Sequence, residues 1–248
     1  MNRQGRATPV DSSWYGPFNS FAIAPEGGRL AVGTGSAGDG LSVSLKQLSG
    51  GVFSRLSFGG QDRRPVWSPD GKTVAFVRDS TNGGGVYGVA ADGGGAARLL
   101  AQLKVPVQEV AWSGDGRWLV LRTDNGTAGA GDLIGVRVDG DTAQVPLVTS
   151  RFTEMHPAVS PDGRWLAYIS NETGANEVYV RPFPNSSAGR WQVSNGGGMS
   201  PVWSRDTREL FFVGSGGRLM SADVRTDNGF EVTGARTLFD VSGYALDL

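Results

Sequence analysis

One short pattern occurs five times along the chain, and it limits the possible folds more than any other feature of the sequence. In each copy a run rich in apolar residues reaches a turn of the Ser-Pro-Asp-Gly type, and a second apolar run follows directly. The copies are FAIAPEGGRLAV (21–32), PVWSPDGKTVAFV (65–77), EVAWSGDGRWLVL (109–121), PAVSPDGRWLAYI (157–169) and PVWSRDTRELFFV (201–213). Equivalent positions, counted from Ala24 to Ser204, are 44, 45, 47 and 44 residues apart. A period of this length is typical of a β-propeller, in which each repeat forms a four-stranded blade.

The turn in each repeat has a clear chemical basis. Proline presets its own φ angle, Asp and Ser side chains can bond nearby backbone N–H groups, and glycine supplies the positive φ that lets the chain reverse. The two apolar runs around the turn therefore predict a β-hairpin. The last copy departs from the pattern, with Arg205 and Thr207 where most other copies have proline and glycine. No stretch has helical periodicity of useful length, so we predict an all-β fold.

The period divides the chain into five complete blades and an incomplete sixth, within a single domain. The predicted blades lie near residues 19–58, 63–102, 107–150, 154–195 and 199–240, with a partial closing blade formed from 1–18 and 241–248. The next turn would fall near position 249. We therefore interpret the sequence as an excerpt of a longer chain, or a truncated reading frame, and a five-bladed ring with loose ends is the alternative.

Composition excludes several classes of protein. With 23 basic and 24 acidic residues the net charge is −1, which does not favour nucleic acid or an anionic membrane surface as a partner. Cysteine is absent, so disulfides, thiol nucleophiles and Cys-rich zinc sites are excluded. His156 is the only histidine, so a three-histidine zinc site is impossible and a serine hydrolase triad would have to include it. We find neither an apolar run long enough to span a membrane nor a signal peptide.

Alternation along the first strand of each blade predicts which side chains face the central channel. Counted back from the repeat Ser, or from Ala24 in the first copy, position −2 holds residues small enough for a crowded axis: Ala22, Val66, Ala111, Ala158 and Val202. Position −1 holds bulky residues suited to packing between blades: Ile23, Trp67, Trp112, Val159 and Trp203. Because side chains two apart share a face of a strand, position −4 should also face the channel.

Position −4 is polar or charged in every copy, and we predict that it forms a ligand-binding ring at the channel mouth: Ser20, Arg64, Glu109, His156 and Ser200. Position −5, together with one residue of the partial blade, gives a predicted rim: Asn19, Arg63, Gln108, Met155, Met199 and Tyr244. Two plainer interpretations stay open. Arg64 and Glu109 can simply pair with each other, and His156 can make a structural hydrogen bond.

Four stretches, PVWSPDGKTVAFV, HPAVSPDGRWLAYIS, NEVYVRPFP and PVWSRDTRELFF, resemble the repeats of TolB-like (WD-type) β-propellers. RQG near the start, EVYVRPFP, WQVSNGGG and a later LFD are similar to the C-terminal propeller of bacterial eukaryotic-like serine/threonine kinases. That resemblance implies a six-bladed sensor or protein-binding domain that follows a kinase domain and a membrane segment, and so an extracytoplasmic location. The kinase motifs themselves are absent here. A free-standing TolB-like protein, or the non-catalytic propeller of a prolyl-peptidase, would look broadly similar.

The leading functional hypothesis is a non-catalytic binding module without a cofactor, whose channel mouth recognises a protein, a peptide or a small ligand. We expect a monomer with no nucleic-acid partner, which meets a membrane only through flanking segments. The alternative is a metal-dependent hydrolase of the lactonase or phosphotriesterase kind, with an axial calcium ion. Its oxygen ligands would have to come from Glu109 and Asp247, and further from Glu154 and Asn19. A third possibility is a purely structural fragment.

Overall fold

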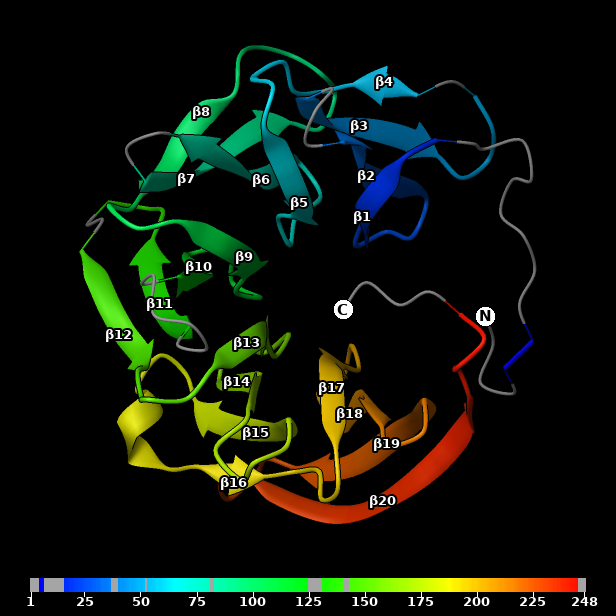
Figure 1. Cartoon of the computed structure of the whole chain (residues 1–248), viewed down its shortest axis with the longest axis vertical. Coiled ribbons are helices and arrows are strands. Elements are labelled where there is room, and N and C mark those ends of the chain that lie inside the picture. The colour runs from blue at the N-terminus through cyan, green and yellow to red at the C-terminus, as the bar shows by residue number, and fades with distance from the viewer. Residues whose placement is uncertain are drawn as a thin grey trace.

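The structure is a computed structural model that describes residues 5–6, 16–36, 40–51, 53–80, 83–124, 131–140 and 143–244. Twenty strands form five separate four-stranded sheets, and each sheet is antiparallel with its strands in sequence order. Figure 1 shows the five sheets arranged as blades around a common centre, with the first strand of each blade innermost. The all-β prediction and the five four-stranded blades are confirmed.

The strands follow the repeats. Blade 1 contains β1 (Phe18–Ile23), β2 (Arg29–Ser36), β3 (Gly40–Gln47) and β4 (Ser54–Arg55). Blade 2 contains β5 (Asp62–Trp67), β6 (Thr73–Ser80), β7 (Gly83–Ala90) and β8 (Arg98–Gln102). Blade 3 contains β9 (Val107–Trp112), β10 (Trp118–Asp124), β11 (Gly131–Arg137) and β12 (Gln144–Val148).

The remaining two blades complete the arc. Blade 4 contains β13 (Glu154–Val159), β14 (Trp165–Ser170), β15 (Glu177–Pro182) and β16 (Trp191–Gln192), with the short 3-10 helix η1 (Ser186–Ala188) before β16. Blade 5 contains β17 (Gly198–Trp203), β18 (Glu209–Gly214), β19 (Arg218–Arg225) and β20 (Glu231–Asp240). Within the described residues no helix has the length and apolar character needed to span a bilayer.

The repeat turn is built by one serine and one aspartate. In blade 2, Ser68 Oγ donates to Asp70 Oδ1 at 2.6 Å, and the backbone N–H of Lys72 donates to the same carboxylate oxygen at 3.0 Å. The hydrogen bond from Ser68 is the main reason that the pKa of Asp70 is lowered. The same Ser-to-Asp bond occurs in the last copy, between Ser204 and Asp206, although Thr207 takes the glycine position there with φ of 61°. The degenerate last copy therefore forms the same turn.

The hydrophobic core lies between neighbouring blades. Trp67 and Trp203, at position −1, are 7% and 9% exposed, and each indole N–H donates at 3.0 Å to a carbonyl of the preceding blade, those of Ala22 and Ala158. The prediction that these tryptophans pack between blades is confirmed. Trp112 differs, because it is only half-buried and its N–H donates to Gly116 in its own turn.

Within the described residues, one face of blade 1 has no such cover. Phe21 and Ile23 on β1 are each 58% exposed, although Trp67 and Trp203 at the position equivalent to Ile23 are buried. Most of the predicted closing blade, including Asp247, lies outside the described residues. Blades 1 and 5 are the two ends of the arc (Figure 1), and Arg205 Nη2 connects them by donating to the carbonyl of Pro25 at 3.0 Å.

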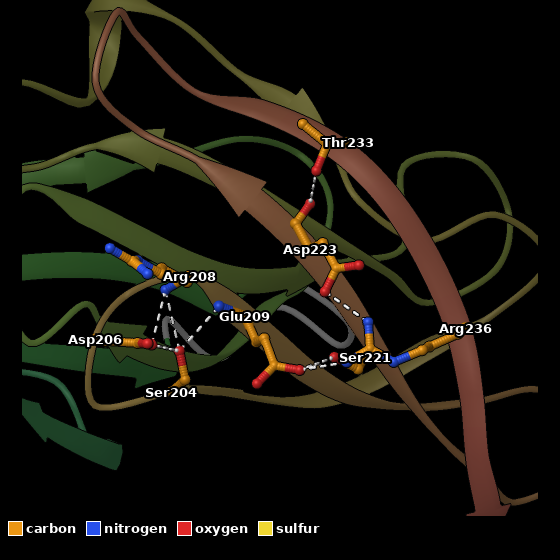
Figure 2. A network of polar contacts seen from close by, with 8 residues as sticks. All are labelled: Ser204, Asp206, Arg208, Glu209, Ser221, Asp223, Thr233 and Arg236. Carbon is orange, nitrogen blue, oxygen red and sulfur yellow. Dashed lines mark hydrogen bonds and ion pairs between the residues drawn. The ribbon is translucent and has the colours of Figure 1, made fainter.

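The last strand of blade 5 is held by a surface network. Arg236 on β20 donates to Asp223 on β19 and to Glu209 on β18, both at 2.6 Å, so one guanidinium joins three neighbouring strands (Figure 2). Residues 5–6 lie against the same strand, since a Cβ added to Gly5 would be 3.0 Å from Cγ of Phe239. The described N-terminal residues are therefore close to the end of blade 5.

Candidate functional site

All five innermost strands carry an irregularity in their pairing, and three of them share one β-bulge. In β13 the pairing with β14 steps from Met155 to Ala158, and β5 and β17 show the same step between Arg63 and Val66 and between Met199 and Val202. In β1 and β9 the irregularity lies earlier in the strand, at Asn19 and Gln108, so Ser20 and Glu109 remain paired with Gly33 and Arg122. A bulge places an extra residue opposite one partner and turns its side chain in a new direction.

Three of the bulged residues have left-handed backbone, which is uncommon for residues other than glycine. Arg64, His156 and Ser200 have φ of 54°, 52° and 50°. A proline follows each of them, and proline suits a bulge because it has no N–H that would be left without a ladder partner. Such backbone costs of order 1–3 kcal/mol per residue and persists only where the surroundings enforce it. The repeat therefore fixes the direction of these three side chains at an energetic cost.

The three bulged residues lie around one cavity of about 260 Å³. All five residues of the predicted ring line it: Ser20, Arg64, Glu109, His156 and Ser200. Position −2 lines it in three blades, through Ala22, Val66 and Val202, whereas Ala111 and Ala158 pack against the hydrophobic core instead. Sequence reasoning missed position −3, which also reaches the cavity. In three strands the bulge interrupts the alternation and brings a proline there: Pro65, Pro157 and Pro201. Phe21 and Val110 line the cavity from β1 and β9, which lack that bulge. The Arg-Pro, His-Pro and Ser-Pro pairs were the available signal.

Polar contacts run across three blades at the cavity wall. Glu109 Oε1 lies 3.1 Å from Arg122 Nη1 and 3.8 Å from His156 Nε2, and Glu109 Oε2 accepts a hydrogen bond of 2.6 Å from the backbone N–H of His156. On the other side of the imidazole, Nδ1 lies 3.3 Å from Ser200 Oγ. Glu109 is 8% exposed, so water screens its charge little, and Arg122 is the arginine in contact with its carboxylate. His156 thus makes structural hydrogen bonds, as the plainer of its two interpretations predicted.

Comparison with known families identifies the repeat. The family described as "TolB beta propeller domain" matches residues 5–204. The chain belongs to the TolB β-propeller family.

Solved structures agree on the fold of this TolB-family propeller. The putative TolB from Agrobacterium tumefaciens superposes with a TM-score of 0.73 at 20% identity, covering 90% of this chain and 81% of that chain. TolB from Acinetobacter baumannii gives 0.69 at 17% identity, covering 91% and 56%. The tricorn protease gives 0.57 at 15% identity, and there the match covers 89% of this chain but 22% of the protease. At these identities the likeness shows the fold alone.

The rim residues of this TolB propeller do not form one continuous surface. Arg63 is bound within the fold, because it makes a bidentate contact of 2.9 Å with Asp79 and donates to two carbonyls of β9. Asn19 and Arg63 line a separate cavity of about 330 Å³ together with Arg64. The other predicted rim residues do not line the central cavity: Gln108, Met155, Met199 and Tyr244.

The described part of this TolB propeller contains no group of three or more His, Asp or Glu side chains arranged to hold a metal ion. Glu109 is occupied by Arg122 and His156, and Asp247 lies outside the described residues. Glu154 is 2% exposed and accepts hydrogen bonds from Ser150 and Ser170, while its second carboxylate oxygen has no partner. Burial raises the pKa of Glu154. This carboxyl does not line the cavity, so it adds nothing to an axial site.

Proposed function

We propose that this propeller is a non-catalytic binding module that recognises a protein, a peptide or a small ligand at the channel mouth. The observation that carries the proposal is the meeting of five equivalent polar side chains at one cavity, three of them on left-handed backbone. Strained conformations of this kind gather at sites where a side chain must be aimed for a function.

The proposal is tested by photo-crosslinking at two matched positions. Val202 lines the cavity and is 58% exposed, whereas Leu99 lies on the outer strand β8 and is 51% exposed. The photoreactive residue p-benzoylphenylalanine replaces one or the other in the cells that produce the protein. We expect a discrete adduct from position 202 and none from position 99, and loss of the adduct when Arg64→Met is added. Equal adducts at both positions, or none at position 202, would contradict binding at the mouth.

We further propose that the propeller is the extracytoplasmic part of a bacterial signalling kinase. The support is the likeness of EVYVRPFP, WQVSNGGG and LFD to the propellers that follow such kinases. The coding sequence around this chain tests the proposal directly. A kinase catalytic domain and a membrane-spanning helix encoded upstream in the same frame are expected. A gene that encodes only a free-standing propeller or a peptidase domain would contradict it.

A further inference from the structure

An asparagine that precedes a glycine can react with its own backbone. The glycine nitrogen attacks the side-chain amide of the asparagine, and a residue without a Cβ hinders this approach least. Four such pairs occur in the sequence, beginning at Asn82, Asn125, Asn195 and Asn228. The structure describes both residues of the last two pairs, so the surroundings of these two can be compared directly.

The pair at Asn195 is protected by a buried carboxylate. Asn195 itself is exposed, but the backbone N–H of Gly196 donates to Glu177 Oε1 at 2.7 Å. The N–H of Gly197 donates to the same oxygen at 2.9 Å, and Glu177 is only 3% exposed. The attacking nitrogen must first lose its proton. A carboxylate beside it holds that proton and repels the negative charge that its loss would leave.

The pair at Asn228 lacks this protection. It lies in the turn between β19 and β20, where both Asn228 and Gly229 are exposed. Within the described part of the chain, neither the Asn228 side chain nor the Gly229 N–H makes a hydrogen bond. A Cβ added to Gly229 would meet nothing within 4 Å, so a ring that forms here has open space around it. The two pairs therefore differ in what the glycine N–H contacts, although both asparagines are exposed.

We propose that Asn228 is a site of spontaneous modification, at which the chain itself converts asparagine to aspartate or isoaspartate. The Gly229 nitrogen gives its proton to water or hydroxide and bonds to Cγ of Asn228. The bond from Cγ to the side-chain nitrogen breaks, and that nitrogen takes a proton from water and leaves as ammonia. A second water opens the resulting succinimide ring at either carbonyl. One opening gives aspartate, and the other gives isoaspartate, in which Cβ has become part of the main chain.

The isoaspartyl product acts on the packing between blades 4 and 5. Phe230 directly follows Gly229 and is 5% exposed, and its ring centroid lies 5.3 Å from that of Trp165 and 5.5 Å from that of Trp191 in blade 4. β20 begins at the next residue. An extra main-chain atom therefore enters a short turn that is anchored by a buried ring, and close-packed interiors tolerate such displacements poorly. None of these residues lines the central cavity, so the inference is independent of the proposed function.

Peptide mapping by mass spectrometry tests the site, after incubation of the whole chain in mildly alkaline buffer. An aspartate-specific protease then distinguishes aspartate, which it cleaves, from isoaspartate, which it does not. In the folded protein we expect Asn228 to react about tenfold faster than Asn195, the effect of one hydrogen bond to a charged acceptor. In denaturant, which removes the contact with Glu177, the two rates should become similar. A rate at Asn228 no greater than that at Asn195 in the folded protein, or a difference that persists in denaturant, would overturn the proposal.

Thermal unfolding tests the consequence, in a chain whose other two pairs are removed by Asn82→Ser and Asn125→Ser. After incubation, ion exchange separates the modified chain, which carries one more negative charge, from the unreacted chain. We expect the isoaspartyl form to unfold about 2–4 °C lower. Asn228→Asp, which has the same charge and a normal main chain, should unfold with the unreacted chain. Equal midpoints for the isoaspartyl form and Asn228→Asp would show that the effect on Phe230 is wrong, while the rates above decide the site itself.

Discussion

At the scale of single residues, left-handed backbone at the central cavity costs folding free energy. In the described chain, four residues other than glycine have positive φ, and three of them line the central cavity: Arg64, His156 and Ser200. The fourth is Thr207, in a surface turn. The same conformation is free of strain where glycine supplies it, as in the turns that connect the first two strands of the blades.

Alanine substitutions at two adjacent glycines of blade 1 distinguish the effect of backbone strain from that of side-chain crowding. Gly27 has φ of 81° and Gly28 does not have positive φ, and a Cβ on either would meet nothing within 4 Å. We expect Gly27→Ala to lower the free energy of unfolding by about 1 kcal/mol, because alanine is strained in the left-handed region. Gly28→Ala should change it by less than about 0.5 kcal/mol. Chemical denaturation of both variants tests this, and equal effects would contradict it.

Glu154 should make stability depend on pH. Burial raises its pKa in the folded protein above that of the unfolded chain, so its favourable contribution is complete at low pH and is lost as pH rises. Glu154→Gln keeps an acceptor for Ser150 and Ser170 and removes the buried charge. We expect it to stabilise the protein by about 1 kcal/mol at pH 7, and to have little effect at pH 4. A gain that is larger at pH 4 than at pH 7 would contradict this assignment.

At the scale of elements, the contribution of an inter-blade indole hydrogen bond to stability can be measured by comparing Trp67 with Trp112. Trp67 donates to the carbonyl of Ala22 in the preceding blade, whereas Trp112 donates within its own turn. Trp67→Phe leaves that carbonyl without its donor in a buried interface, so we expect a loss of about 1–2 kcal/mol. Trp112→Phe should cost about 0.5 kcal/mol or less. Thermal and denaturant unfolding of both variants checks the difference, and a reversed order would refute the role given to Trp67.

The strands show how far the sequence could predict this molecule. Hairpins, blades and the residues at position −4 follow from periodicity and turn chemistry, because these depend on neighbours along the chain. The bulges do not, because a bulge is decided by the pairing between two strands. Strict alternation therefore missed Pro65, Pro157 and Pro201 at the cavity. Likewise, only the folded chain shows that Glu109 contacts Arg122 and His156, since these partners come from different strands.

At the scale of the whole molecule, the exposed side of blade 1 makes the excerpt hypothesis testable. Phe21 and Ile23 are each 58% exposed there. If the natural chain continues, an extension by about 30 residues at each end should supply the missing strands of a four-stranded blade and raise the unfolding midpoint by several degrees. Phe21→Gln should lower the unfolding midpoint more in the extended chain than in this one. An extension without effect would favour the five-bladed alternative.

Calcium distinguishes the binding module from the hydrolase. Because the described residues offer no metal-binding group, we expect the unfolding midpoint to be unchanged by calcium or by a chelator. A ligand that binds only the folded state must stabilise it. A rise of several degrees with calcium, reversed by the chelator and accompanied by chelator-sensitive ester hydrolysis, would instead support an axial metal site.

The bond between Arg205 and Pro25 joins residues 180 positions apart, at opposite ends of the arc. The spacing between blades 1 and 5 therefore helps to set the width of the central channel. The bond from Arg205 to Pro25 is a direct polar contact between the two end blades, whereas the strands within each blade are held by their own ladders. Since Ser20 of blade 1 and Ser200 of blade 5 both line the central cavity, a ligand at the mouth would brace the two ends of the arc from the inside.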